Sequence, residues 1–451
     1  MGAGPAPLRP LETSHVMSSQ LSRRRFLTRS TQAVVVTKLL SYAGPAWAVS
    51  PNEKLNIAVI GTANQARYDL DNVAHENIVA LCDVDEVFLN KAGESYTGAK
   101  KFRDYRRVLD LKGIDAVTVA TPDHTHAVIT AAALHSGRHV YCEKPLARTI
   151  AEVRFVTELA RKKKLVTQIG TQIHGGANYR RVVELIQSGA IGTVNEVHVW
   201  VGGGFGGKTR PTATPPVPTT LEYDLWLGPV EARPYSPEYL PFVWRNWWAF
   251  GGGTLADLGC HHVDLSHWAL GLHSPVKVRV VDGPKPDPEC PPTWLIVESE
   301  YNAPGNSTGL KPGSVKLTWY HGDKRPPHFA DGQLPKWGNG TLFVGSKGLL
   351  LADYDRHVLL PEKNFAGFTA PKPFLAASIG HHREWTEACK HGGKPLCNFD
   401  YSGPLTEAVL LGNVAHRAQK DLVWNAAKMR AEHCPEADEF IHYHYRKGWK
   451  L

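Results

Sequence analysis

An apolar run followed by a glycine turn constrains the fold of this chain more than any other feature. Leu55–Ile60 has the composition of a buried strand, and Gly61 opens a turn into a helical segment. A second apolar run, Ile78–Cys82, ends in Asp83. Strand, tight turn, helix, strand and acid in this order are typical of a dinucleotide-binding β-α-β unit. A β-α-β repeat that binds no cofactor is the alternative.

The turn departs from the usual G-x-G-x-x-G pattern at its second glycine, which is Ala63 here. A methyl group at that position restricts how closely the backbone can approach a pyrophosphate. The carboxylate of Asp83 would bond ribose hydroxyls and repel a 2′-phosphate, so the sequence predicts NAD as the cofactor, with NADP less favoured. The predicted cofactor contacts in this unit are Gly61, Ala63, Asn64, Gln65 and Asp83.

Strands and helices then continue to alternate. Asp115–Ala120 and Arg138–Cys142 are strand-like runs, and polar residues follow each of them. Ligands of an open parallel sheet bind beyond the carboxyl ends of its strands, so these residues should reach the same crevice. They are Thr121, Pro122, His126, Glu143 and Lys144. The sequence therefore predicts an N-terminal Rossmann domain over residues 51–170.

A glycine-rich stretch, Gly251–Gly253, leads into a predicted helix that carries Asp257, His261, Asp264 and Trp268 at i, i+4, i+7 and i+11. A histidine held by an aspartate one turn away has a fixed tautomer and a stabilised cation, as a general base requires. A surface ion pair is the alternative. His261, His262, Asp264 and His267 also suggest a metal, but no third ligand of metal-type spacing lies nearby, so no metal site is predicted.

Together these pieces resemble the Gfo/Idh/MocA oxidoreductase family, typified by glucose–fructose oxidoreductase and inositol dehydrogenase. The resemblance covers residues 55–270 and includes the Thr-Pro-x-x-x-His element and Glu143-Lys144-Pro145. It implies that Lys144 is the active-site lysine, Asp257 the orienting acid and His261 the general base. It also implies that a hydride moves between a sugar or polyol carbon and a nicotinamide ring.

Residues 171–451 read as a second, α+β domain. Val194–Val201 alternates as a half-buried strand, and no helical pattern interrupts the later strand candidates, so the sequence predicts an open, largely antiparallel sheet. The later candidates are residues 275–281, 294–301, 314–320, 341–344 and 349–352. An amphipathic helix before Gly189 and helices near 380–391 and 401–418 complete this domain. The resemblance implies that this sheet carries the substrate site and forms a homo-oligomer interface.

The substrate is expected to be a small sugar or glycoside. A long loop rich in Gly, Pro and Thr, residues 202–241, precedes a cluster of aromatic side chains that could stack on a sugar or simply fill the core. The predicted substrate-binding residues are Gln172, Tyr179, Trp244, Arg245 and Asp264.

The amino-terminal 48 residues read as an export signal. Ser22–Leu27 contains three arginines, and an apolar run leads to the small-residue site Ala46-Trp47-Ala48. This pattern predicts a twin-arginine signal peptide over residues 1–48 and a periplasmic protein. A basic helix that stays attached is the alternative, although the run is too short for a stable membrane span.

The formal net charge of +8 does not indicate a nucleic-acid partner. Residues 1–48 hold six Arg or Lys and one Glu, so only about +3 remains for the other residues.

The seven cysteines are widely spread without a C-x-x-C pair, so no disulfide framework is implied. Cys82, Cys142 and Cys260 lie in or beside apolar runs and should be buried.

The sequence analysis thus favours an exported NAD(P)-dependent dehydrogenase of sugars, glycosides or polyols. A glycoside hydrolase that uses bound NAD for a transient oxidation is one alternative. A sugar-binding relative without catalysis is another, which Lys144, Asp257 and His261 make less favoured.

Overall fold

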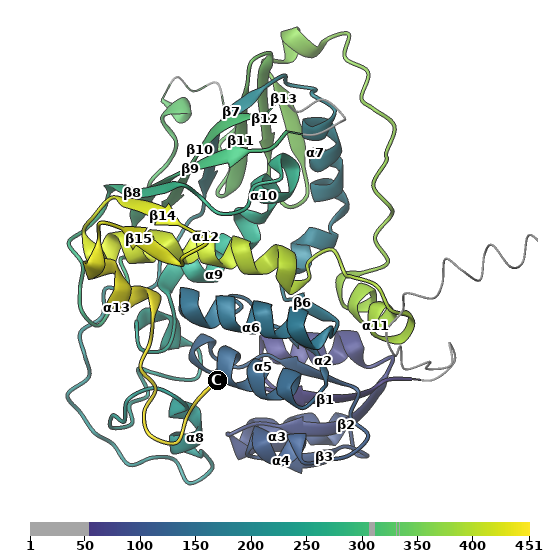
Figure 1. Cartoon of the computed structure of the whole chain (residues 1–451), viewed down its shortest axis with the longest axis vertical. Coiled ribbons are helices and arrows are strands. Elements are labelled where there is room, and N and C mark those ends of the chain that lie inside the picture. The colour runs from purple at the N-terminus through teal and green to yellow at the C-terminus, as the bar shows by residue number, and fades with distance from the viewer. Residues whose placement is uncertain (1–53, 306–311, 331, 333) are drawn as a thin grey trace, which may run out of the picture. The chain divides into compact units, whose positions relative to one another are not determined.

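The computed structural model describes residues 54–305, 312–330, 332 and 334–451 (Figure 1). The predicted signal peptide, residues 1–48, lies outside the described residues. Val49–Leu451 form one compact unit, and within its described residues the chain builds two sheets with helices packed around and between them.

The first sheet is parallel throughout and has the strand order β3-β2-β1-β4-β5-β6. Its strands are β1 (Asn56–Ile60), β2 (Asn77–Cys82), β3 (Lys100–Phe102), β4 (Ala116–Val119), β5 (His139–Cys142) and β6 (Thr167–Ile169). The helices between them are α2 (Gln65–Val73), α3 (Glu86–Ser95), α4 (Tyr105–Leu109), α5 (Asp123–His135) and α6 (Ile150–Lys163). The predicted Rossmann architecture is confirmed. The sequence analysis missed β3 and β6, which are three residues long.

Three helices of this layer, α3, α4 and α6, begin at side-chain caps. Asp85 accepts a hydrogen bond from the Val87 amide at the start of α3. Thr149 and Glu152 bond each other's backbone amides and so form a capping box at α6. These contacts satisfy amides that have no partner within the helix, which fixes where each helix begins.

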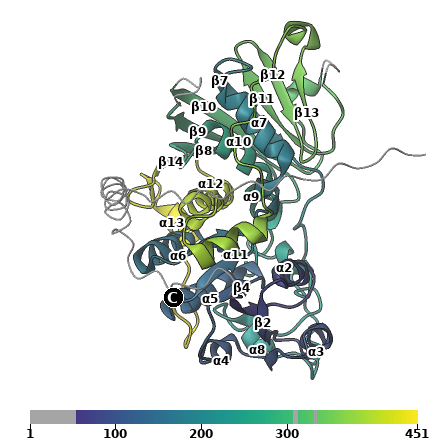
Figure 2. The same ribbon diagram turned by 90° about the vertical axis from the view of Figure 1, so that its right-hand side faces the viewer.

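The second sheet has the strand order β13-β12-β11-β7-β10-β9-β8-β14-β15 and is antiparallel except between β7 and β10. Its strands are β7 (Val194–Trp200), β8 (Lys277–Asp282), β9 (Leu295–Ala303), β10 (Gly313–His321), β11 (Gly340–Gly345), β12 (Gly348–Ala352), β13 (His357–Leu360), β14 (Leu422–Asn425) and β15 (Arg430–Glu432). The prediction of an open, largely antiparallel sheet is confirmed. The helices α7 (Ala177–Gln187) and α10 (Asp264–Leu270) pack against each other beside this sheet (Figures 1 and 2).

Two C-terminal helices, α11 (His381–His391) and α12 (Phe399–Ala418), return to the first sheet. α11 packs on α2, and α12 packs on α6 as well as on α9 (Gly253–His262) and β8 (Figure 1). Arg154 on α6 donates two hydrogen bonds to Glu407 on α12, at 2.7 and 2.6 Å. These helices therefore join the two sheets rather than belonging to the second one alone.

The long helix predicted after Gly253 is in fact two helices. α9 ends at His262 and α10 begins at Asp264, with Val263 between them. The Val263 carbonyl accepts hydrogen bonds from the Ser266 and His267 amides and from the Ser266 hydroxyl, and so starts α10. The break ends the common face that a single helix would have given to Asp257 and Asp264.

Smaller differences concern the segments beside these helices. The amphipathic helix predicted before Gly189 is α7, which begins at Ala177 and has the predicted substrate residue Tyr179 in its first turn. The long loop after β7 contains one short helix, α8 (Tyr223–Leu227). All seven cysteines are buried free thiols, as expected for Cys82, Cys142 and Cys260. None of the helices in the described part of the chain combines the length and apolarity needed to cross a membrane.

Candidate functional site: a dinucleotide cleft that ends at an ion triad

A cleft of about 370 Å³ lies at the carboxyl ends of β1, β2, β4 and β5. The residues predicted to bind the cofactor line it, with one exception: they are Gly61, Ala63, Asn64, Gln65, Asp83, Thr121, Pro122, Glu143 and Lys144. The parallel sheet brings these residues together because every strand ends at the same edge.

The glycine turn fits a dinucleotide. Gly61 has φ +92, and a Cβ there would lie 2.3 Å from the Ala120 carbonyl oxygen, so only glycine is accommodated. Asn64 has a positive φ of 59 and leads directly into α2. The turn therefore aims the amino terminus of α2 at the cleft, where unpaired amides and the helix dipole suit a pyrophosphate.

Asp83 also fits this ligand. Its side chain accepts hydrogen bonds from the Thr62 amide and hydroxyl, both at 2.9 Å, and from the Asp85 amide at 3.0 Å. These bonds hold the carboxylate at the mouth of the turn. An ionised carboxylate has about four acceptor sites, so capacity for a ribose hydroxyl remains.

His126 is the exception among the predicted cofactor contacts. Its ring is buried, with Nδ1 2.7 Å from the Pro145 carbonyl oxygen and Nε2 2.6 Å from that of Thr121. It is not among the residues that line the cleft. His126 therefore links the segments that follow β4 and β5, and it does not line the cleft.

Two segments far away in the sequence cover the cleft, and the sequence analysis did not predict the second. The first is the loop around α8, which contributes Leu221, Leu240 and Phe242 to the lining. The second is the C-terminal tail, where Trp449 joins the lining and lies under the Arg106 guanidinium at 5.3 Å. No local pattern could reveal a contact between a tail and a strand end more than 300 residues earlier.

Lys144, Asp257 and Arg245 form an ion triad at one end of the cleft. The Lys144 ammonium donates to Asp257 Oδ1 at 2.7 Å and to the Asp257 carbonyl oxygen at 3.0 Å. Arg245 Nε donates to the same carboxylate oxygen at 2.6 Å, and the guanidinium stacks on Trp244 at 4.0 Å. Burial would raise the pKa of Asp257, but the two cations lower it to about 2. Asp257 is therefore ionised at every working pH.

His261 lies one turn beyond Asp257 on α9, and neither residue is among those that line the cleft. Among the described residues no hydrogen bond joins the two side chains, so the expectation that Asp257 orients this imidazole is corrected: Lys144 and Arg245 occupy the carboxylate instead. Burial and then the charge of Lys144 lower the pKa of His261 well below its usual value. The ring is neutral at neutral pH, the form that can accept a proton.

Asp123, which the sequence analysis did not single out, adds no charge to this region. It begins α5, is buried, and its two carboxyl oxygens have no hydrogen-bond partner among the described residues. Burial raises its pKa to about 8, although Arg245 and Lys144 oppose that rise. With Asp123 protonated, the triad retains a net charge of +1.

The predicted substrate-binding residues separate into two sets. Trp244 and Arg245 line the cleft. Gln172 donates to Glu143 at 2.6 Å, and the buried Tyr179 donates from its hydroxyl to the His261 carbonyl at 3.3 Å. Most neighbouring aromatic side chains, including Trp247 and Phe250, are fully buried and serve as core.

Asp264 does not face the cleft, and this prediction is corrected. Its side chain is fully buried, accepts from His174 Nδ1 at 2.9 and 3.0 Å, and accepts from the Tyr401 hydroxyl at 2.6 Å. With α10 starting at this residue, the carboxylate points back toward η1, the 3-10 turn Gln172–Gly175, instead of toward the end of the cleft.

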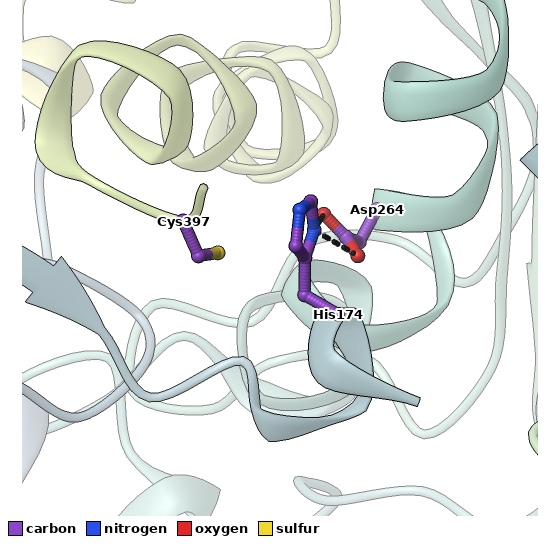
Figure 3. A group of neighbouring side chains, drawn as sticks. All are labelled: His174, Asp264 and Cys397. Carbon is purple, nitrogen blue, oxygen red and sulfur yellow. Dashed lines mark hydrogen bonds and ion pairs between the residues drawn. The ribbon is translucent and has the colours of Figure 1, made fainter. Parts of the chain in front are cut away.

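Cys397 completes a buried group with His174 and Asp264 whose ligand atoms lie within 4.8 Å of one another (Figure 3). Imidazole, carboxylate and thiol are ligand types that zinc accepts. However, the carboxylate and Nδ1 already bond each other, and Tyr401 also bonds the carboxylate. The arrangement is explained as a satisfied hydrogen-bond network behind α9. A second such group, Glu196, His198 and His328, lies at β7.

Two family models match this chain in succession. The model described as "Oxidoreductase family, NAD-binding Rossmann fold" covers residues 55–171. The model described as "Oxidoreductase family, C-terminal alpha/beta domain" covers residues 176–310. Together they span more than half of the chain and meet at the junction of the two sheets.

The chain belongs to the Gfo/Idh/MocA oxidoreductase family.

Curated relatives match over part of the chain. Inositol 2-dehydrogenase of Salmonella typhimurium is 32% identical over 146 residues, which cover 32% of this chain and 43% of that protein. Levoglucosan dehydrogenase of Pseudarthrobacter phenanthrenivorans is 30% identical over 180 residues, which cover 38% of this chain and 37% of that protein. The chain thus matches about two fifths of the length of these relatives.

Solved structures of the family share the fold over most of the chain. The WlbA dehydrogenase of Bordetella pertussis, in complex with NADH and UDP-GlcNAcA, aligns with a TM-score of 0.60 and 17% identity, covering 83% of this chain and 99% of that one. Levoglucosan dehydrogenase, in complex with NADH and levoglucosan, aligns with a TM-score of 0.54 and 17% identity, covering 82% and 100%. At this identity the likeness concerns the fold.

The buried position of Asp264 leads to a stability prediction for this family member. Asp264→Asn replaces one acceptor oxygen with a donor that faces His174, so we expect a loss of about 1–3 kcal/mol in the free energy of unfolding. Denaturant unfolding measures it. Asp110→Asn, whose side chain is 72% exposed, is the control and should change stability by less than about 0.5 kcal/mol. If Asp264→Asn left stability unchanged but weakened substrate binding, Asp264 would be a substrate-binding residue after all.

Proposed function

We propose that this chain is an NAD-dependent dehydrogenase that oxidises a hydroxyl-bearing carbon of a sugar, glycoside or polyol. The observation that carries this proposal is the position of Lys144, which lies both in the dinucleotide cleft and in the ion triad with Asp257 and Arg245. The names of the relatives, inositol and levoglucosan dehydrogenases, support the substrate class.

The cofactor would lie along the first domain. The turn from Gly61 to Gln65 would hold the pyrophosphate, Asp83 the ribose hydroxyls, and the ends of β4 and β5 the nicotinamide half. When bound, the dinucleotide supplies the hydride acceptor. The protein's part is to place the substrate carbon against it and to manage the proton of the hydroxyl.

Lys144 and His261 divide that task. The ammonium of Lys144 would bond the substrate oxygen and offset the negative charge that develops on it. Asp257 and Arg245 fix the ammonium, and the net positive charge of the triad favours the same oxygen. His261, neutral because of its lowered pKa, would accept the hydroxyl proton.

Removal of His261 should therefore lower turnover without removing the fold. For His261→Ala we expect a loss of about a hundred- to ten-thousand-fold in kcat, the usual effect of losing a general base. Lys144→Ala should lower kcat and weaken substrate binding together. Formation of NADH from a panel of polyols and sugars measures both.

His262→Ala is the control for this experiment, because its ring bonds the Tyr354 hydroxyl at 3.0 Å and is given no role in proton transfer. Loss of turnover in His262→Ala but not in His261→Ala would contradict the assignment. Cleavage of a glycoside with no accumulation of NADH would point to the redox-assisted hydrolase instead.

The preference for NAD over NADP is a separate prediction. Asp83 would repel a 2′-phosphate, and Arg103, which also lines the cleft, is already paired with Glu222 at 3.0 Å and with the Thr220 carbonyl at 2.6 Å. Titration of the purified protein should show tighter binding of NAD. Tighter binding of NADP would overturn the preference, and binding of neither would show that Ala63 crowds the pyrophosphate.

Export through the twin-arginine route is proposed from the sequence of residues 1–48. Changing Arg23 and Arg24 to Lys should keep the protein in the cytoplasm, and the exported form should begin near Val49. Cell fractionation and N-terminal sequencing measure these outcomes. An exported protein that still begins at Met1 would refute the proposal.

We also propose that the protein is a homo-oligomer assembled through the second sheet. Val281 near the end of β8 and Val423 on β14 support this, because 45% and 50% of their surfaces are exposed. Sedimentation velocity should show a species larger than one chain, and Val423→Lys should shift it toward the monomer. A monomer at all concentrations would contradict the proposal.

A further inference from the structure

Behind the wall of the cleft, two carboxyl side chains meet in the protein interior. Asp69 projects from α2 and Glu143 from the end of β5, and they are 0% and 4% exposed. Glu143 lines the cleft and directly precedes Lys144. The two carboxyl groups interact with each other, and burial raises the pKa of both. Two adjacent buried carboxylates repel each other strongly, so the pair holds one proton between them.

The hydrogen bonds around the pair show where that proton lies. Glu143 accepts from Gln172 at 2.6 Å, from Gln65 at 3.4 Å and from the Lys144 amide at 3.2 Å. Asp69 Oδ1 accepts from His382 Nε2 at 2.8 Å. Asp69 Oδ2 is buried and has no donor among the described residues. A proton shared with Glu143 satisfies this remaining oxygen.

His382 connects the pair to a second cavity. This cavity has a volume of about 460 Å³, is lined by His75, Arg383 and Gln172 as well as His382, and lies apart from the residues that line the dinucleotide cleft. The His382 ring stacks on Tyr141 at 4.8 Å, and burial lowers its pKa to about 4, so it is a neutral donor to Asp69. The order Glu143, Asp69, His382 thus joins the two cavities.

The surroundings of the pair contain one fixed positive charge. The titratable or charged groups that face it are Tyr141, Cys142, Lys144, His381 and His382. Of these, the two histidines are neutral and the tyrosine and thiol are protonated at neutral pH, because burial shifts each pKa in that direction. Lys144 is already bonded to Asp257. The proton content of the pair therefore responds to any further charge placed in the cleft beside Glu143.

We propose that the Asp69–Glu143 pair is a proton-exchange site that follows the redox state of the cofactor and reaches solvent through His382. This rests on the proposed function. A bound dinucleotide supplies a ring that carries one positive charge when oxidised and none when reduced. The pair gives up its shared proton when the oxidised form binds, because a nearby positive charge favours two carboxylates.

The same coupling balances the reaction. Oxidation of the alcohol yields a carbonyl, a hydride carried by the cofactor and one proton from the hydroxyl. The loss of positive charge in the cleft raises the proton affinity of the pair, so the pair takes up one proton from the second cavity through His382, while His261 holds the proton that the hydroxyl releases. The net charge of the cofactor ring and the pair together is then the same before and after the hydride moves. Release of the reduced cofactor and binding of the oxidised one returns that proton through Asp69 and His382 to the second cavity.

Proton release on cofactor binding tests this proposal without turnover. The protein is mixed with NAD or with NADH in weakly buffered solution, and a pH indicator counts the protons released per dinucleotide bound between pH 6 and 8. We expect a release of up to about half a proton with NAD at pH 7, where Asp69 with a pKa of about 7 is half protonated, a larger release toward pH 6, and much less with NADH. Binding of NAD with no more release than NADH overturns the proposal alone, whereas binding of neither overturns the proposed function with it.

Asp69→Asn and Asp71→Asn form the matched pair of variants. Both lie on α2, but the Asp71 side chain is 49% exposed and pairs with Arg67. Asp69→Asn should abolish the difference between NAD and NADH, and Asp71→Asn should leave it as in the wild type. An unchanged difference in Asp69→Asn contradicts the proposal. Should that variant fail to fold, His382→Gln decides: it keeps a donor to Asp69, so the number of protons stays the same while stopped-flow release becomes slower, and an unchanged rate contradicts the route.

Discussion

The contact of Lys144 with Asp257 is the interaction on which the rest of the site depends. Lys144 lies two residues beyond the end of β5 in the first sheet, and Asp257 lies on α9, 113 residues later. Both side chains are only 10% exposed. A buried carboxylate without a partner is strongly disfavoured, so the fold must bring a cation to Asp257, and it brings two. The result is an ammonium with a fixed position and a net positive charge at the end of the dinucleotide cleft.

The first domain was predictable from the sequence because its signals are local. An apolar strand, a glycine with φ +92 and an acid after the next strand are all read within 30 residues, and a parallel sheet aligns the strand ends without further information. β3 escaped prediction because it has three residues, two of them exposed lysines, and β13 because its four residues are too few to show a periodic pattern. The contact of Trp449 with the cleft depends on how the tail crosses the first domain, which no local pattern encodes.

The wrong expectation that Asp257 orients His261 shows when helical spacing fails to predict a side chain's partner. A pair at i and i+4 contributes about 0.2–0.5 kcal/mol, whereas a hydrogen bond to a charged group contributes about 1.5–3 kcal/mol. Lys144 and Arg245, which lie outside α9, therefore bond the Asp257 carboxylate in place of His261. The same argument applies to Asp264, where a buried histidine and a tyrosine hydroxyl hold the side chain and the helix breaks one residue before it. In both cases the sequence analysis recognised an important carboxylate but did not predict the side chains that bond it.

Two consecutive residues, Glu143 and Lys144, explain why one carboxyl group near the cleft is ionised and another carries a proton. Glu143 and Lys144 are consecutive residues that follow β5. Lys144 bonds Asp257, whereas Glu143 bonds Gln172. On one side, Lys144 keeps Asp257 ionised, with a pKa of about 2. On the other, Glu143 and Asp69 are both buried, and burial raises the pKa of Asp69 to about 7. Carboxyl groups whose environments drive their pKa values apart take different roles. The ionised carboxylate of Asp257 fixes Lys144, which would bind the substrate oxygen. The Asp69–Glu143 pair would gain or lose a proton when the charge in the cleft changes.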